Sequence, residues 1–262
     1  MKLHQPASMM FRQIILLAFL IFLPISSSFA SEIEALFIKA NEYYQNGDYK
    51  AAIAEYSKIH DLGYESWEVY YNLGNAYYKD RQIARAILNF ERAKKLNPKN
   101  EDIQFNLELA NLTVADRIPQ LPALFIFTWL SNIAQLFSMQ MLGAITLAVY
   151  LSMTVIIFIR IFFKSNRFKR ASFVAIIFAT ILLLFFSGIF FYRVYENETK
   201  IEAIVLVDKV DVKSAPDEAG TELFALHAGV KVQIKDRSNN WIKIRLNDGK
   251  VGWLKDDIIE KI

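Results

Sequence analysis

Few residues in this chain have side chains and spacing suited to catalysis or metal binding. Its 262 residues contain three histidines, His4, His60 and His227, and no cysteine. Thiolate chemistry, disulfides and cysteine-ligated metals are therefore excluded. The carboxylates form no recognisable acid/base pair, and HExxH, GxSxG and glycine-rich phosphate-loop motifs are absent. We expect a protein that is not an enzyme and uses no metal or cofactor, with His60 and His227 at the surface.

Asparagine, tyrosine and alanine recur with a fixed period. Residues 33–66 align with residues 67–100, so the period is 34 residues. The matching residues are Asn41 with Asn75, Tyr43-Tyr44 with Tyr77-Tyr78, Ala52-Ile53 with Ala86-Ile87, and Tyr56 with Phe90. A repeat of this length is typical of a repeated pair of helices.

The second unit carries most of one repeat pattern: Tyr70-x-x-Leu73-Gly74-x-x-Tyr77, then Ala86-x-x-x-Phe90, Ala93 and Pro98. The chain thus resembles the tetratricopeptide repeat family, which implies an α-helical solenoid. Gly74, like Ala40 in the first unit, is small where the two helices of a unit cross. A third first helix over 101–117 has Glu108 at this position, and we interpret it as a capping helix that completes a domain over 31–118.

The resemblance also gives candidate peptide-binding residues, because the first helix of each unit lines a concave groove. They are Phe37, Asn41, Tyr44, Tyr71, Asn72, Asn75, Tyr78, Phe105 and Asn106. Asparagine donates and accepts hydrogen bonds, so it can hold an extended peptide backbone. Domains of this family that clamp a C-terminal carboxylate also have asparagine where Asn41 and Asn72 stand. Their basic residues are replaced here by Phe37, Asp102 and Asn106. We expect peptide binding without carboxylate capture; the alternative is asparagines that are merely solvated.

The first 30 residues resemble a secretory signal peptide. Lys2 and Arg12 precede an apolar run over 14–23, and Ser28 and Ala30 are small residues suited to a cleavage site. A membrane-spanning helix needs roughly 20 apolar residues, so the run is too short to be a convincing anchor. We expect cleavage after Ala30, with an uncleaved anchor as the alternative.

The chain is uncharged between Arg117 and Arg160 and again over 171–192, which predicts a transmembrane hairpin with helices over 142–163 and 171–193. Arg160 is close enough to the end of the first helix to reach the headgroups. The loop over 164–170 carries Lys164, Arg167, Lys169 and Arg170. Such a loop stays in the cytoplasm by the positive-inside rule. Both flanking modules then lie on the exported side, in agreement with the signal peptide. This predicts a bacterial inner-membrane protein in contact with membrane lipid.

The segment over 119–141 is also uncharged. Its polar residues Thr128, Ser131, Asn132, Gln135 and Ser138 recur at helical spacing, and Trp129 is suited to the headgroup level. We expect an interfacial helix. The alternative is a third membrane span, which would require either the basic loop or the signal peptide to be misinterpreted.

The last residues, 200–262, predict an all-β module. Runs such as 202–207, 209–214, 230–235 and 241–246 predict about five short strands, and Asn247-Asp248-Gly249 predicts a hairpin turn. The stretches VKSAP, LHAGVKVQI and NNWIKIRLNDGKVGWL resemble the bacterial SH3-like (SH3b) family. This resemblance implies a small barrel in which Val212 to Pro216 open the first loop and Gly229 enters the third strand. Trp241 and Trp253 are the candidates for its binding groove, with core positions as the alternative.

Charge argues against nucleic acid as a partner. Residues 31–118 carry 11 basic and 14 acidic groups, and residues 200–262 carry 11 of each. Neither module is a basic patch. The net charge of +3 comes from the first 30 residues and from 119–199, the segments expected to meet the membrane.

The sequence therefore predicts a multi-domain membrane protein made of a helical solenoid, a two-helix transmembrane hairpin and a small SH3-like barrel. This order resembles the tetratricopeptide proteins of the bacterial aerotolerance operon. The resemblance implies von Willebrand factor A domain membrane proteins as partners and a part in oxidative-stress tolerance or envelope integrity. We expect a scaffold that binds proteins; the alternative is a sensor or targeting protein whose SH3-like domain binds peptidoglycan.

Overall fold

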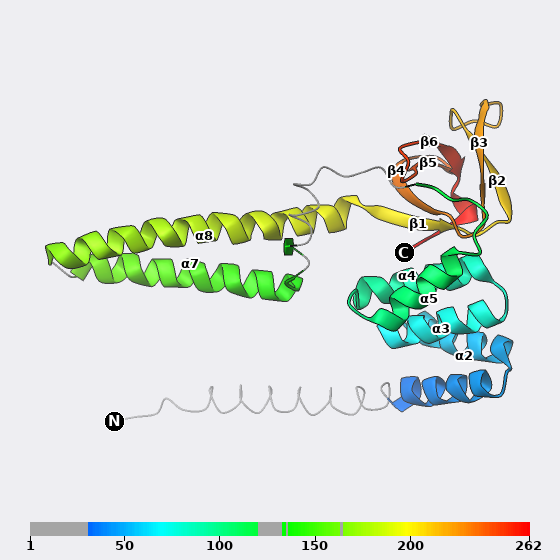
Figure 1. The fold of residues 1–262 in the computed structure, drawn as a ribbon, viewed down its shortest axis with the longest axis horizontal. Coiled ribbons are helices and arrows are strands. Elements are labelled where there is room, and N and C mark those ends of the chain that lie inside the picture. The colour runs from blue at the N-terminus through cyan, green and yellow to red at the C-terminus, as the bar shows by residue number, and fades with distance from the viewer. Residues whose placement is uncertain (1–30, 120–132, 135, 163–164) are drawn as a thin grey trace, which may run out of the picture. The chain divides into compact units, whose positions relative to one another are not determined.

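A computed structural model describes residues 31–119, 133–134, 136–162 and 165–262 of the chain, with the backbone alone for 196–199. The expected signal peptide and most of the expected interfacial helix, Trp129 included, lie outside the described residues. The chain divides into two compact units (Figure 1). One combines the residues up to Arg117 with Glu202–Arg245 and Val251–Ile262, and the other contains Ile118–Ile201 with Leu246–Lys250.

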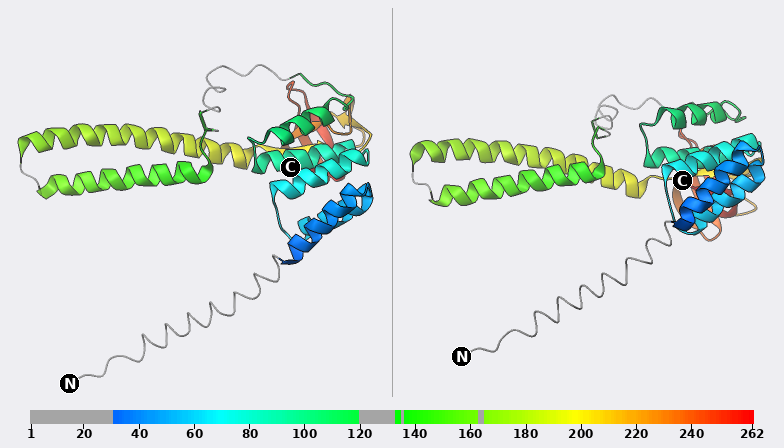
Figure 2. Two further views of the ribbon diagram at one scale, coloured as in Figure 1. Left: turned by 60° about the horizontal axis from the view of Figure 1, so that its bottom comes forward. Right: turned by 90° about the horizontal axis from the view of Figure 1, so that it is seen from below.

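The helical part of the first unit is a stack of antiparallel helices that lie side by side (Figure 2). A helix over 31–45 is followed by α2 (Tyr49–Asp61), α3 (Trp67–Lys79), α4 (Ile83–Leu96) and α5 (Glu101–Asn111). The turns that join the two helices of each repeat share one backbone conformation. Gly47 and Arg81, which are 34 residues apart, both have a positive φ, of 80° and 64°. The repeat in sequence is thus a repeat in backbone conformation.

Helix starts also follow the repeat. Ser66 Oγ accepts a hydrogen bond from the Val69 amide at 3.2 Å, and Asn100 Oδ1 accepts one from the Ile103 amide at 3.0 Å. Ser66 and Asn100 are 34 residues apart and precede α3 and α5. Each supplies an acceptor to an amide that has no partner inside its helix.

The expected crossing of the two helices in the second repeat is confirmed. A Cβ built on Gly74 would lie 2.7 Å from two ring atoms of Phe90. The equivalent Ala40, and Ala52 and Ala86 on the partner helices, are fully buried. Only a residue without a side chain lets the Phe90 ring lie directly on the α3 backbone.

The capping helix is shorter than predicted. α5 ends at Asn111, whereas the sequence predicted a helix up to residue 117. Thr113 Oγ1 donates to the Ala110 carbonyl at 2.7 Å, which closes the end of the helix. Beyond it, the side chains of Val114 and Asp116 contact the C-terminal module. These contacts require an extended chain and compete with further helix.

The C-terminal module is an antiparallel sheet of seven strands in the order β3-β2-β6-β5-β4-β1-β7 (Figure 1). The strands are β1 (Ile201–Val205), β2 (Lys209–Lys213), β3 (Glu222–His227), β4 (Lys231–Ser238), β5 (Trp241–Arg245), β6 (Val251–Lys255) and β7 (Ile259–Lys261). A short 3-10 helix, η1 (Asp256–Ile258), precedes β7. The buried residues alternate along the strands, as with Val232 and Ile234 on β4 and Ile242 and Ile244 on β5.

The number of strands was underestimated. Gly229, with a φ of 92°, enters the fourth strand rather than the third, because β3 lies between it and the first long loop. β3 was missed because only Leu226 among its residues is fully buried. The predicted turn at Asn247-Asp248-Gly249 does join two paired strands, β5 and β6. Gly249 has a φ of 90° there.

The second unit is built on two long apolar helices, α7 (Met139–Phe162) and α8 (Asn166–Thr199), which lie antiparallel (Figures 1 and 2). Both are long and apolar enough to cross a membrane. α7 starts at residue 139 because Ser138 caps it, with Oγ accepting from the Met141 amide at 3.1 Å. The last residues of the expected interfacial segment, 139–141, therefore belong to α7.

The start of α7 packs on the end of α8. Leu142 and Ala134 are fully buried in a cluster with Ile189. Arg193 Nη1 donates to the Ala134 carbonyl at 2.9 Å. Residue 134 thus lies at the end of the hairpin that is opposite to its bend.

Candidate functional site

Asparagines of the predicted groove pair across successive first helices. Asn72 Nδ2 donates to Asn41 Oδ1 at 3.3 Å, and Asn106 Nδ2 donates to Asn75 Oδ1 at 2.8 Å. The two pairs are equivalent, since each member is displaced by one repeat. The Tyr56 hydroxyl also donates to Asn41 Oδ1. These asparagines are therefore part of an ordered ladder and are more than solvated side chains.

A hollow of about 290 Å³ lies beside the second pair. Its lining residues are Tyr44, Tyr71, Asn75, Tyr78, Lys79, Phe90, Asn106 and Leu109. The structure thus brings together five of the predicted groove residues and adds Lys79, Phe90 and Leu109. Phe90 comes from α4, a second helix, and reaches the hollow because Gly74 lets α4 approach α3.

The remaining candidates lie outside this hollow. Phe37 packs edge-on to the Tyr56 ring at 5.9 Å and belongs to the core of the first repeat. Phe105 is 66% exposed and lines no part of it. Asn41 and Asn72 form the ladder one repeat earlier.

The hollow is polar without being strongly charged. Asn106 Nδ2 donates to the Tyr71 hydroxyl at 3.0 Å, so the hydroxyl hydrogen is available for another acceptor. Burial, with the neighbouring Tyr49 and Tyr71, raises the pKa of Tyr44. Lys79 is the one cation among the lining residues. Such a surface matches a chain of amides and apolar side chains better than a carboxylate.

Two tyrosines behind the groove will make stability fall at high pH. Tyr56 and Tyr70 are 1% and 4% exposed, and burial raises the pKa of each to about 12. Unfolded tyrosine ionises near pH 10. The stability that these protonated hydroxyls contribute is therefore complete below about pH 10 and is lost as the pH rises from about 10 to 12.

Phenolate absorbance of the full-length protein should show this late ionisation. We expect Tyr56→Phe and Tyr70→Phe each to remove one late step, and denaturant to abolish both. A folded protein whose phenolate signal is complete near pH 10 would contradict the assignment.

The C-terminal module shares a hydrophobic core with α4. Ile87 of α4 and Ile204 of β1 are 1% and 0% exposed in one cluster, with Leu206 and Val114 packed against it. A Cβ on Gly229 would lie 3.1 Å from Ile87 Cδ1 and 2.9 Å from Val114 Cγ2. The backbone before β4 therefore lies directly against the helical domain.

A buried lysine forms two ion pairs beside this shared core. Lys231 Nζ lies 3.0 Å from Glu91 of α4 and 2.7 Å from Glu202 of β1. Burial acts to lower the pKa of Lys231, but the charges and hydrogen bonds of the two glutamates outweigh it and raise the pKa. Each carboxylate side chain is less than a third exposed. The lysine is thus the shared counter-ion of both domains.

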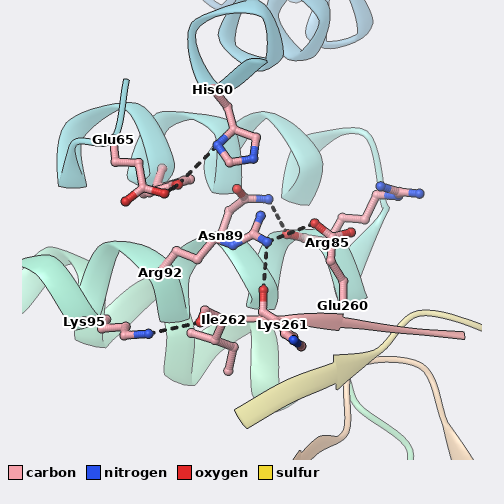
Figure 3. Close-up of polar contacts among 10 residues, drawn as sticks. His60, Glu65, Arg85, Asn89, Arg92, Lys95, Glu260, Lys261 and Ile262 are labelled. Carbon is pink, nitrogen blue, oxygen red and sulfur yellow. Dashed lines mark hydrogen bonds and ion pairs between the residues drawn. The ribbon is translucent and has the colours of Figure 1, made fainter. Parts of the chain in front are cut away.

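Strand β7 lies along α4 through further contacts, which Figure 3 shows. Arg92 Nη2 donates to Glu260 at 3.0 Å and to the Lys261 carbonyl at 2.7 Å, and Lys95 Nζ donates to the Ile262 carbonyl at 3.1 Å. The Arg92 guanidinium also lies 5.8 Å from the centre of the Tyr70 ring. The same arginine thus contacts α3 and β7.

The two histidines are partly exposed, and each has a specific partner that the sequence did not predict. The Tyr70 hydroxyl lies 3.2 Å from both His60 Nδ1 and Glu65 Oε1. The His227 amide donates to Asp116 Oδ2 at 2.7 Å, and its Nδ1 lies 3.0 Å from Oδ1. His60 supports Tyr70, and His227 joins the two domains. Asp116 is 111 residues from His227 and follows the early end of α5, so spacing did not reveal this pair.

The two predicted tryptophans lie on the outward face of β5 and β6. Each is half-buried and is paired across the strands with a lysine, Trp241 with Lys255 and Trp253 with Lys243. The Nζ atoms lie 6.0 and 5.8 Å from the respective ring centres. The structure thus puts Trp241 and Trp253 on one surface with two lysines, of which Lys255 also pairs with Glu218 at 2.6 Å.

Comparison with known families agrees with these two parts. Residues 33–59 and 67–100 match the tetratricopeptide repeat, and residues 208–259 match the bacterial SH3 domain. No curated protein matches the chain. Among the described residues, no group of three or more histidines and carboxylates could hold a metal ion. The chain contains tetratricopeptide repeats and a bacterial SH3 domain, joined in one compact unit.

Proposed function

We propose that the chain is a non-catalytic adaptor anchored in the bacterial inner membrane, which binds an extended segment of a partner protein in its tetratricopeptide groove. The observation that carries this is the asparagine ladder beside the tyrosine-lined hollow. The donors and acceptors that these pairs leave unused, such as the Tyr71 hydroxyl hydrogen, match a peptide backbone, and the lack of a basic clamp disfavours a terminal carboxylate.

The membrane anchor rests on α7 and α8. Only 6% and 11% of the residues in the most apolar stretches of these two helices are buried. Large apolar side chains such as Ile161 and Leu184 are about 70% exposed. A core helix of a soluble protein would bury them, whereas a bilayer supplies about 30 Å of hydrocarbon for them to face.

Because the two domains share a core, we infer that the chain crosses the membrane an even number of times between residues 117 and 202. One compact unit lies on one side of a membrane, so both residues lie on that side. The hairpin also starts and ends on one side, since Arg193 contacts residue 134. This favours an interfacial role over a third span for residues 119–138. With the basic bend in the cytoplasm, both domains are periplasmic.

The domain order supports a more specific identity. We infer that the protein is BatE, the tetratricopeptide protein of the bacterial aerotolerance operon. Its partners are then von Willebrand factor A domain membrane proteins, and its role is in oxidative-stress tolerance or envelope integrity. Two weak contacts from one anchored chain reinforce each other through their effective concentration.

Photo-crosslinking in intact cells tests the groove. A photoreactive residue in place of Leu109 should trap a periplasmic protein, and Asn75→Ala with Asn106→Ala should reduce the yield about tenfold, because these changes remove the two amide side chains of the hollow that would hydrogen-bond to a bound backbone. Asn111→Ala, an exposed change at the end of α5, is the matched control. Equal yields from the control and the groove variant, both folded by circular dichroism, would remove the groove from the proposal.

A second candidate function is cell-wall binding through the SH3 domain. The outward Trp241 and Trp253, each beside a lysine, favour it because aromatic rings and cations together suit anionic glycan or peptide ligands. Sedimentation with purified sacculi separates the two. An adaptor stays in solution, and a cell-wall sensor sediments unless both tryptophans are changed to alanine.

A further inference from the structure

The bend of the hairpin contains a hollow of about 440 Å³ lined by three cations. Its lining residues are Arg160, Asn166, Lys169, Arg170 and Phe173. Arg160 comes from the end of α7 and the others from the start of α8. The hollow belongs to neither the peptide groove nor the SH3 domain.

Arg160 is held in place across the two helices. Its Nη1 donates to the Lys169 carbonyl at 2.7 Å and to Ser172 Oγ at 3.0 Å, and Ser172 is only 4% exposed. The guanidinium also lies 5.7 Å from the centre of the Phe173 ring. A guanidinium has five N–H donors, more than these contacts use. It is thus a fixed cation with donors left for an anion.

The hairpin itself supplies no anion to this bend. No aspartate or glutamate occurs between Asp116 and Glu196, whereas 160–170 contains five basic residues. Cations that face a low-dielectric layer require an anionic partner. That partner must come from outside the hairpin.

The surroundings identify the kind of anion. Phe173 is 56% exposed, and Phe162 at the end of α7 is 66% exposed. Of these two rings, only Phe173 lines the hollow, and a ligand that contacts it and the cations has an apolar part and an anionic head. A phospholipid supplies both at the depth of the bend, and basic pockets at this level of transmembrane helices bind lipid headgroups.

We propose that this hollow binds the phosphate of an anionic phospholipid, with Lys169 and Arg170 as its ligands and Arg160 as the cation held between the helices. The proposal rests on the membrane anchor of the proposed function. Bound lipid would neutralise the bend and hold the ends of α7 and α8 together.

Native mass spectrometry of the full-length protein in detergent tests this, with phosphatidylglycerol as the probe and phosphatidylcholine as the zwitterionic comparison. We expect phosphatidylglycerol to bind more tightly, and Lys169→Gln and Arg170→Gln each to weaken it about fivefold. Arg167→Gln removes the same charge from the same bend but does not line the hollow. It should change binding less than twofold.

Equal effects of the three substitutions would show that the lipid is attracted by overall charge, and would overturn the site. Displacement of the bound lipid by inorganic phosphate at the same concentration would also overturn it. Alkaline extraction of membranes separates this from the anchor. A chain released into the supernatant contradicts the anchor and the lipid site together. A chain that stays in the membrane and binds both lipids alike contradicts the lipid site alone.

Discussion

Replacing Lys231 by alanine should lower the free energy of unfolding by roughly 3 kcal/mol, because it removes the cation that two largely buried carboxylates share. Glu91 and Glu202 are 13% and 26% exposed, and both contact Lys231 within 3.0 Å. One belongs to the helical domain and the other to the sheet. The change therefore weakens the joint between the domains as well as the local structure.

Urea denaturation of a chain in which a flexible Gly/Ser linker joins residues 31–117 to residues 202–262 measures this loss. Lys235→Ala is the matched control, since Lys235 lies on the same strand and is exposed. Replacing all three charges at once, as Glu91→Gln, Lys231→Met and Glu202→Gln, should recover most of the stability, because no unpaired charge remains. A Lys231 variant no less stable than the Lys235 control would show that the ion pairs do not join the domains.

Substituting alanine for Gly74 should cost about 2 kcal/mol, although alanine is the better helix former by about 1 kcal/mol. The added methyl group would lie 2.7 Å from the Phe90 ring, which is 1% exposed and has no room to move away. Packing therefore outweighs helix propensity at this position.

A double-mutant cycle with Phe90→Leu identifies the cause. Leucine lacks the Cε1 atom and the rigid ring, and its two Cδ atoms can turn away from residue 74, so the pair of changes should cost at least 1 kcal/mol less than the sum of the single changes. Gly188→Ala is the contrasting helical glycine, because a Cβ there meets no atom within 4 Å. Strict additivity of the Gly74 and Phe90 changes would mean that the two helices do not cross there.

The order of modules and most helix starts follow from local sequence. The 34-residue period, the caps at Ser66 and Asn100, and the crossing at Gly74 each depend on residues within one repeat. The two long apolar helices likewise follow from length and composition alone. Patterns of this kind act over a few turns of chain, so they survive in the folded protein.

The sequence predicted a groove lined by asparagine and tyrosine, but not how these side chains pair with each other. Asn41, Asn72, Asn75 and Asn106 were placed on first helices by the repeat. Which of them hydrogen-bond to each other depends on the spacing between helices. The same spacing brings Phe90 into the hollow and keeps Phe37 in the core.

By itself, the sequence determined the repeats, the hairpin and the SH3-like module, because hydrophobic period, capping and turn residues act locally. Only the tertiary structure decided that the first and last modules form one unit. Its contacts, such as Glu91 with Lys231 and Asp116 with His227, join residues more than 100 positions apart. Nothing in the neighbouring sequence distinguishes these residues as contacts between domains, and only the packing of Ile87 against Ile204 brings them together. That packing also ends α5 early, since Val114 and Asp116 gain more from the sheet than from another turn of helix.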